Sequence, residues 1–99
     1  MTKADIVSEV AKATGLTKIE TKTVVDGVLS TIIAAVSSGK RIELRGFGVF
    51  KHKGRKPRMA RNPKTGEAVP LEKRFVPVFK PSPDFLKKVN ESIKKQNEE

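Results

Sequence analysis

Residues 51–66 read KHKGRKPRMARNPKTG, and this stretch decides how the rest of the chain is interpreted. From Lys51 to Lys64 it holds seven Lys or Arg residues and no acidic residue. Repulsion among these cations makes the segment costly to fold onto a protein core, so we expect it to project into solvent unless a polyanion neutralises it. It closes on the turn sequence Arg61-Asn62-Pro63-Lys64-Thr65-Gly66. The stretch predicts a basic hairpin whose tip proline fits the groove of a nucleic-acid duplex.

The whole chain agrees with this local signal. Its 99 residues allow one domain, and its formal net charge is +10, a balance that favours nucleic acid or an anionic membrane surface as partner. No apolar run reaches the roughly 18 residues that span a bilayer. The N-terminus also lacks the basic start and apolar stretch of a signal peptide. We therefore expect a soluble, intracellular protein with no membrane partner.

Nothing in the sequence indicates an enzyme. There is no cysteine, so disulfides and thiolate metal sites are excluded. His52 is the single histidine and has no paired carboxylates near it in the sequence, which argues against a metal or acid–base role. No phosphate-cradling glycine loop and no nucleophile with a base are recognisable. We expect no catalytic residue, no metal and no cofactor.

The N-terminal third predicts two helices. Thr2 with Asp5 starts the first and Gly15 ends it as a left-handed cap, while Thr17 with Glu20 has capping-box spacing for the second, which Gly39 stops. The second helix carries a wide apolar surface formed by Val24, Val25, Val28, Leu29, Ile32, Ile33 and Val36. A helix of such breadth needs two partners, and in so small a chain we expect the second partner to be another copy, giving a homodimer.

From Lys40 onward the period of the pattern changes. Ile42 and Leu44 alternate with charged residues, and Gly46-Phe47-Gly48 supplies a tight turn into a second strand, so we expect an antiparallel sheet. Prolines 57, 70 and 77 suit protruding or edge strands, and we expect an arm over about residues 52–75. The five phenylalanines stand beside valines, which favours core positions over platforms for single-stranded bases; they are Phe47, Phe50, Phe75, Phe79 and Phe85.

The C-terminal segment predicts a last, short helix. Ser82 fits the N-cap and Pro83 the first helical position, with Phe85, Leu86, Val89 and Ile93 facing inward. The tail from about 94 to 99 is expected to fray. The fold class is therefore α+β, one domain over residues 1–99, with two N-terminal helices, an antiparallel sheet bearing a β-ribbon arm, and a C-terminal helix.

Several spaced elements, in order, resemble the bacterial histone-like DNA-binding proteins, HU and integration host factor. They are residues 46–50, Arg55, Arg58, Ala60, residues 61–66 and residues 76–81, and the resemblance covers residues 1 to about 90. It implies an intertwined dimer whose two ribbon arms wrap the minor groove of double-stranded DNA. It also implies that Pro63 wedges between base pairs and kinks the duplex, and that the protein lies in the cytoplasm, associated with the nucleoid.

Site residues follow from the resemblance and from charge. Along the arm, Lys53, Arg55, Arg58 and Arg61 would meet phosphates and compensate the unstacking caused by Pro63. Asn62 and Lys64 flank that wedge and can hydrogen-bond base edges or phosphate. Further contacts are expected on the body, from Lys3, Arg45, Gly46, Lys80 and the helix start at Ser82. Where the family usually has a glycine and a basic residue after Lys80-Pro81, this chain has Ser82-Pro83-Asp84, which weakens the case for that body contact.

Alternative interpretations remain open from the sequence. Pro63 is also a suitable second residue of an ordinary turn. Residues 41–46 look like the beta subunit of integration host factor, where a matching acidic and arginine pair, here Glu43 and Arg45, takes part in sequence-selective recognition; an exposed strand face explains them equally well. The leading hypothesis is a DNA-bending and compacting protein with little sequence preference. The second is a site-selective bender, one half of a heterodimer; RNA and membrane-surface binding are minor alternatives.

Overall fold

The structure is a computed structural model that describes residues 1–97, apart from the side chains of Arg58 and Leu71. The chain divides into two compact units, residues 1–35 and residues 36–99, which are described separately. The single domain expected over residues 1–99 therefore stays a prediction. In the described part of the chain, no helix is long and apolar enough to cross a membrane.

The first unit is a pair of helices with the predicted caps. Helix α1 spans Lys3–Thr14 and ends at Gly15, whose φ of 77° is left-handed. Helix α2 spans Lys18–Ser37, and its start is a capping box in which the Glu20 N–H donates to Thr17 Oγ1 and the Thr17 N–H donates to Glu20 Oε1. The Thr17 hydroxyl also donates to Glu20 Oε1, at 2.8 Å, and this bond, followed by that from the Thr17 N–H, favours the ionised carboxylate and lowers the pKa of Glu20.

Very little of this helical pair is buried. Among the described residues the buried side chains are Val7, Ala11 and Thr21. The apolar stripe of α2 stays open to solvent in the single chain, with 59% of Val24, 52% of Val28 and 67% of Ile33 exposed. The stripe is thus present as predicted, and the helical pair of the single chain leaves it uncovered.

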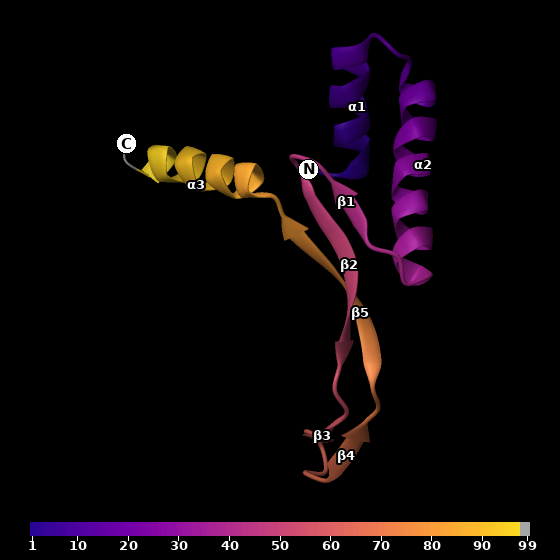
Figure 1. The fold of residues 1–99 in the computed structure, drawn as a ribbon, viewed down its shortest axis with the longest axis vertical. Helices are drawn as coiled ribbons and strands as arrows, with labels where there is room; N and C mark the ends of the chain where they lie inside the picture. The colour runs from indigo at the N-terminus through magenta and orange to yellow at the C-terminus, as the bar shows by residue number, and fades with distance from the viewer. Residues whose placement is uncertain (98–99) are drawn as a thin grey trace. The chain divides into compact units, whose positions relative to one another are not determined.

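The second unit contains the sheet. Strands β1 (Ile42–Leu44), β2 (Gly48–Arg55) and β5 (Arg74–Pro81) form an antiparallel sheet in the order β1-β2-β5. A separate two-stranded hairpin, β3 (Arg58–Arg61) with β4 (Ala68–Leu71), continues from the far ends of β2 and β5 (Figure 1). The predicted α+β class, the antiparallel sheet and the protruding arm are confirmed. A dimer is not part of the single chain and remains a proposal.

Helix α3 spans Pro83–Asn97, and Ser82 Oγ accepts a hydrogen bond from the Phe85 N–H at 3.2 Å, as an N-cap should. The helix includes residues 94–97, for which we expected fraying. Lys94 and Lys95 lie in its last turn, where their positive charges interact favourably with the negative end of the helix dipole. Residues 98 and 99 of that tail lie outside the described residues. The expectation that Leu86, Val89 and Ile93 face inward is wrong within this chain, since about half of each is exposed.

Four phenylalanine rings connect the sheet to α3. Phe50 and Phe79 face each other across β2 and β5 with ring centroids 4.7 Å apart, and Phe47 lies 5.5 Å from Phe85 of α3. Phe79 also contacts Phe85, at 6.2 Å. None of the five phenylalanines is fully buried in the single chain: Phe50 and Phe85 are half-buried, Phe47 and Phe79 are exposed, and the core prediction fails most clearly for Phe75, which is 63% exposed on the arm.

Candidate nucleic-acid interface

The ribbon formed by β2 and β5 has two chemically distinct faces. Residues paired across an antiparallel ladder point to the same side, and successive residues alternate. The register places Arg55 opposite Arg74, Lys53 opposite Val76 and Val49 opposite Lys80. One side therefore gathers the cations, and we call it the cationic face; its charged members are Lys51, Lys53, Arg55, Arg74 and Lys80. The opposite side carries Phe50, His52, Gly54, Phe75, Pro77 and Phe79.

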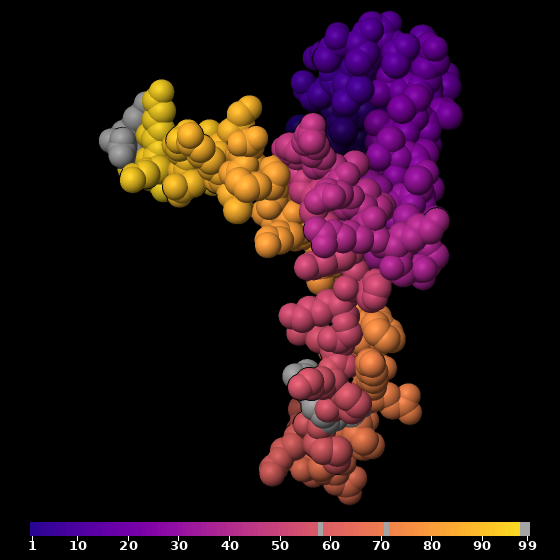
Figure 2. All heavy atoms as spheres, in the orientation of Figure 1, coloured from indigo at the N-terminus to yellow at the C-terminus, as the bar shows by residue number. Residues whose placement is uncertain are grey.

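The cationic face points away from the packed side of the sheet. Phe50 and Phe79 belong to the other face, and Phe79 meets Phe85 of α3 there. Along the arm, Figure 2 shows a slender projection with its side chains in solvent. Lys53, Arg55 and Lys80, which the sequence singled out, are exposed and share this face.

Among the described residues, no ion pair neutralises the cations of this face; β1 adds Glu43 to the same side of the sheet, opposite Val49, but Glu43 pairs with Arg41. The ion pairs found among the described residues are Lys3–Asp26, Lys22–Asp26 and Arg41–Glu43, so none of the five cations of the cationic face has one. An unpaired row of like charges destabilises the free protein slightly and is relieved by a polyanion. Lys51 and Arg74 were missed as site residues; the alternation with Lys53 and Arg55 would have identified Lys51, whereas Arg74 requires the register.

The tip presents Pro63 on a closed turn. Asn62 is tied in three ways: its Oδ1 accepts from the Lys64 N–H at 2.9 Å, its carbonyl accepts from the Gly66 N–H at 2.7 Å, and its N–H donates to the Glu67 carbonyl at 2.8 Å. Gly66 has a left-handed φ of 74°. Pro63 is exposed between these anchors. Pro63 can therefore be both a residue of this turn and a wedge, because the turn leaves its apolar ring exposed.

The remaining arm and tip residues occupy separate places. Arg61 ends β3 and is exposed, as is Lys64. Asn62 has its Oδ1 occupied by the turn, which leaves its side-chain amide N–H groups for a ligand. Arg58 begins β3, but its side chain lies outside the described residues.

Lys3 is engaged within the helical unit. Its Nζ lies 2.7 Å from Asp26 Oδ1, and Lys22 Nζ lies 3.1 Å from Asp26 Oδ2. The hydrogen bond from Lys3, followed by that from Lys22, lowers the pKa of Asp26. A phosphate that binds Lys3 must compete with this carboxylate.

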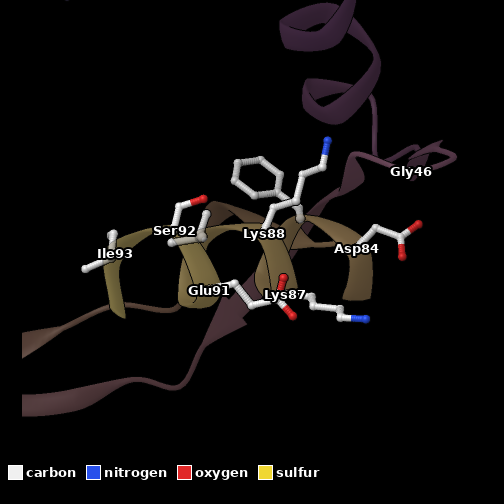
Figure 3. A pocket seen from close by; sticks show the side chains of 9 residues that line it. Gly46, Asp84, Lys87, Lys88, Glu91, Ser92 and Ile93 are labelled. Atoms are coloured by element: carbon white, nitrogen blue, oxygen red, sulfur yellow. The ribbon is translucent and has the colours of Figure 1, made fainter. Parts of the chain in front are cut away.

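The other body residues cluster near the start of α3. Arg45 and Gly46 form the turn before β2, where Gly46 has a φ of 81°, and the Ser82 N–H donates to the Phe47 carbonyl at 2.9 Å. Beside them lies an open hollow of about 850 Å³, lined by Gly46, Asp84, Phe85, Lys87, Lys88, Val89, Glu91, Ser92 and Ile93 (Figure 3). Two lysines and two carboxylates share it, so this flank is less cationic than the ribbon. Glu43 forms its ion pair with Arg41, at 3.7 Å, and Arg45 forms none among the described residues.

The chain is similar to known proteins over nearly its whole length. Residues 1–90 match the family model described as bacterial DNA-binding protein. Integration host factor subunit beta of Marinobacter nauticus is 42% identical over 96 residues, covering 96% of this chain and 98% of that protein. The corresponding subunit of Saccharophagus degradans is also 42% identical, over 97% of this chain and 99% of its own length.

Solved structures give the same result. An Anabaena HU crystallised with DNA superposes with a TM-score of 0.87 at 42% identity, covering 90% of this chain and 97% of that one. HU from Thermotoga maritima superposes with a TM-score of 0.64 at 28% identity, covering 90% and 98% of the two chains.

Proposed function

The chain belongs to the family of bacterial DNA-binding proteins, and on that premise we propose that it bends double-stranded DNA with two ribbon arms, one from each subunit of a dimer. Each arm would lie in the minor groove and insert Pro63 between base pairs. The family is one of DNA-binding proteins rather than of enzymes. We place the protein in the cytoplasm, on the nucleoid.

The observation that carries this proposal is the segregation of charge on the ribbon. Five cations share one face, and within the described part of the chain none of them forms an ion pair. That face leads toward a tip on which a rigid apolar ring is held in solvent. A cationic strip can neutralise the phosphate backbone of DNA, and an apolar wedge at the end of that strip can kink the duplex.

The energetics of bending fit this arrangement. Unstacking a base step costs roughly a few kcal/mol, which is offset when the bend brings more cationic surface against phosphate. Lys53, Arg55 and Arg61 supply that surface along the arm. Since the minor groove presents a degenerate pattern of base edges, such contacts respond to groove shape and deformability more than to sequence. We therefore propose binding with little sequence preference as the main activity.

The dimer is supported by what the single chain leaves uncovered. Val24, Val28 and Ile33 of α2 and Leu86, Val89 and Ile93 of α3 are all more than 40% exposed. Apolar patches of this extent are unusual on a stable monomer. A second copy covering both helices explains them, and we propose a homodimer.

A site-selective bender is the second candidate. It is favoured by the two relatives named integration host factor subunit beta, each 42% identical to this chain. Under this proposal the chain pairs with a different subunit, and Arg45, which has no ion-pair partner among the described residues, contributes to selectivity.

A salt series of binding with the purified chain alone tests the proposal. The substrates are intact and nicked duplexes of arbitrary sequence, with single-stranded RNA as competitor. Steeply salt-dependent binding that favours nicked DNA and ignores sequence is the expected result, with a log–log slope of about −0.9 for each phosphate neutralised. A strong preference for one duplex sequence would favour the second candidate. Effective competition by RNA would contradict both.

A further inference from the structure

Arg55 and Arg74 are direct cross-strand partners in the ribbon. They are also its last paired residues, because β2 ends at Arg55 and β5 begins at Arg74. Beyond them the ladder is interrupted before the β3–β4 hairpin begins at Arg58. The two arginines therefore stand side by side on the cationic face, where the ribbon gives way to the tip hairpin.

This pairing is unfavourable in the free protein. Directly opposite residues in an antiparallel pair have Cβ atoms about 4.5–5.5 Å apart, and like charges at that spacing repel. Both side chains are exposed, and among the described residues neither forms an ion pair. Glu72, two positions from Arg74 in the sequence, does not pair with either of them. The site carries two positive charges, and the described protein supplies no anion to it.

We propose that Arg55 and Arg74 together clamp a single backbone phosphate of DNA. A guanidinium is a planar fork that can donate two hydrogen bonds to phosphate oxygens, so two forks approaching from adjacent strands can share one phosphate group. This clamp rests on the proposed DNA-binding function. It adds a defined position at which the arm holds the DNA backbone. The duplex would be gripped at the base of the tip hairpin, which sets the depth at which Pro63 enters the groove.

The distinguishing measurement is the salt dependence of binding to an arbitrary-sequence duplex for Arg55→Gln, Arg74→Gln and the double variant. If both residues hold one phosphate, each single variant still neutralises it through the remaining arginine. Each should then lose roughly tenfold in affinity, as expected for losing a charge-assisted hydrogen bond, while its log–log slope stays at the wild-type value. The slope should fall only in the double variant, by about 0.9 per arm.

Independent contacts predict a different pattern. Each single variant would then lower the slope by about 0.9 per arm and the double variant by about twice as much. That additive result would overturn the clamp, as would an Arg74→Gln variant with wild-type affinity. If wild-type protein itself shows no salt-dependent DNA binding, the proposed function fails instead.

Two further variants separate the clamp from a general charge effect. Lys73→Gln removes the same charge one position away, but the Lys73 ammonium lies over the Phe75 ring, 5.4 Å from its centroid, on the opposite face of the ribbon. It should lower affinity much less than Arg74→Gln; equal losses would contradict the clamp. Arg74→Lys should keep the slope but recover only part of the affinity, because an ammonium keeps the charge without the fork. Full recovery would show that charge alone acts at this position.

Discussion

Lys3 Nζ lies 2.7 Å from Asp26 Oδ1, although the two residues are 23 positions apart in the sequence. The same carboxylate meets Lys22 Nζ at 3.1 Å through its other oxygen. All three side chains are at least one-third exposed, so the pairs add little to stability. Their consequence concerns binding, because Lys3 is one of the proposed phosphate contacts and is already occupied in the free protein.

Asp26→Asn should therefore strengthen DNA binding. The change removes a competing anion and releases Lys3, so affinity at low salt should rise several-fold and the salt slope should steepen by up to about 0.9 per subunit. The matched control is Glu9→Gln, which makes the same charge change on an exposed residue of α1. Equal effects of the two variants would show that only net charge matters and that Lys3 makes no separate contact.

The same pair predicts a small pH dependence of stability. The pKa of Asp26 is lowered by Lys3 and then Lys22, so the folded state favours the ionised carboxylate. The ion pairs of Asp26 therefore contribute to the free energy of unfolding at pH values above the ordinary carboxyl pKa. This contribution is lost as the pH falls through the lowered pKa of Asp26. Thermal unfolding of wild type and Asp26→Asn should thus differ most near neutral pH and converge in acid. A difference that grows on acidification would contradict this assignment.

Ile33→Glu tests the dimer. In the single chain Ile33 is 67% exposed, so a carboxylate there would be nearly neutral for a monomer. In the proposed dimer it would place an unpaired charge in an apolar interface, at a cost of several kcal/mol. Native mass spectrometry should show a wild-type dimer and loss of that dimer in the variant, with Thr23→Glu, on another side of α2, retaining it. A wild-type monomer at micromolar concentration would refute the dimer.

Gly48→Ala should destabilise the sheet. A Cβ on residue 48 would lie 2.5 Å from the Lys80 carbonyl oxygen and 2.6 Å from two ring carbons of Phe79. Overpacking of this kind costs about 1–3 kcal/mol. Gly27→Ala is the control, since a Cβ there meets nothing within 4 Å inside a helix and should stabilise by about 0.5–1 kcal/mol. Chemical denaturation of both variants checks the opposite signs.

The sequence predicted best those features whose causes are local. Both helix starts depend on side chains three positions apart, Thr2 with Asp5 and Thr17 with Glu20, and both pairs are hydrogen-bonded in the structure. The cap at Ser82 and the left-handed Gly15 are likewise set by their immediate neighbours. Charge density in residues 51–64 was sufficient to predict that the segment leaves the core.

Features that depend on pairing were not predictable. Arg74 joins the site only because the register sets it opposite Arg55, and the Lys3–Asp26 ion pair joins two different helices. Phe75 resembles a core residue by its neighbours in the sequence, yet on the arm it meets only side chains such as Lys73 and His52, and it is 63% exposed. The expectation that Leu86, Val89 and Ile93 face inward failed because nothing in the described part of the single chain covers that face of α3, and each remains about half exposed.

Pro63→Ala should leave folding intact and reduce bending. Pro63 is exposed on a turn whose hydrogen bonds run through Asn62, Lys64, Gly66 and Glu67, so the substitution removes the ring and spares the turn's hydrogen bonds. The preference for nicked over intact duplex should fall with it, because inserting the ring costs less at a nick, where the stack is already interrupted, and a variant without the ring loses that advantage.

The central claim is that this protein bends DNA, and the most direct measurement is the end-to-end distance of a short, doubly labelled duplex by fluorescence energy transfer at saturating protein. Wild type should shorten that distance strongly, and Pro63→Ala at equal saturation should shorten it much less. A duplex that stays straight when saturated with wild-type protein would contradict the account.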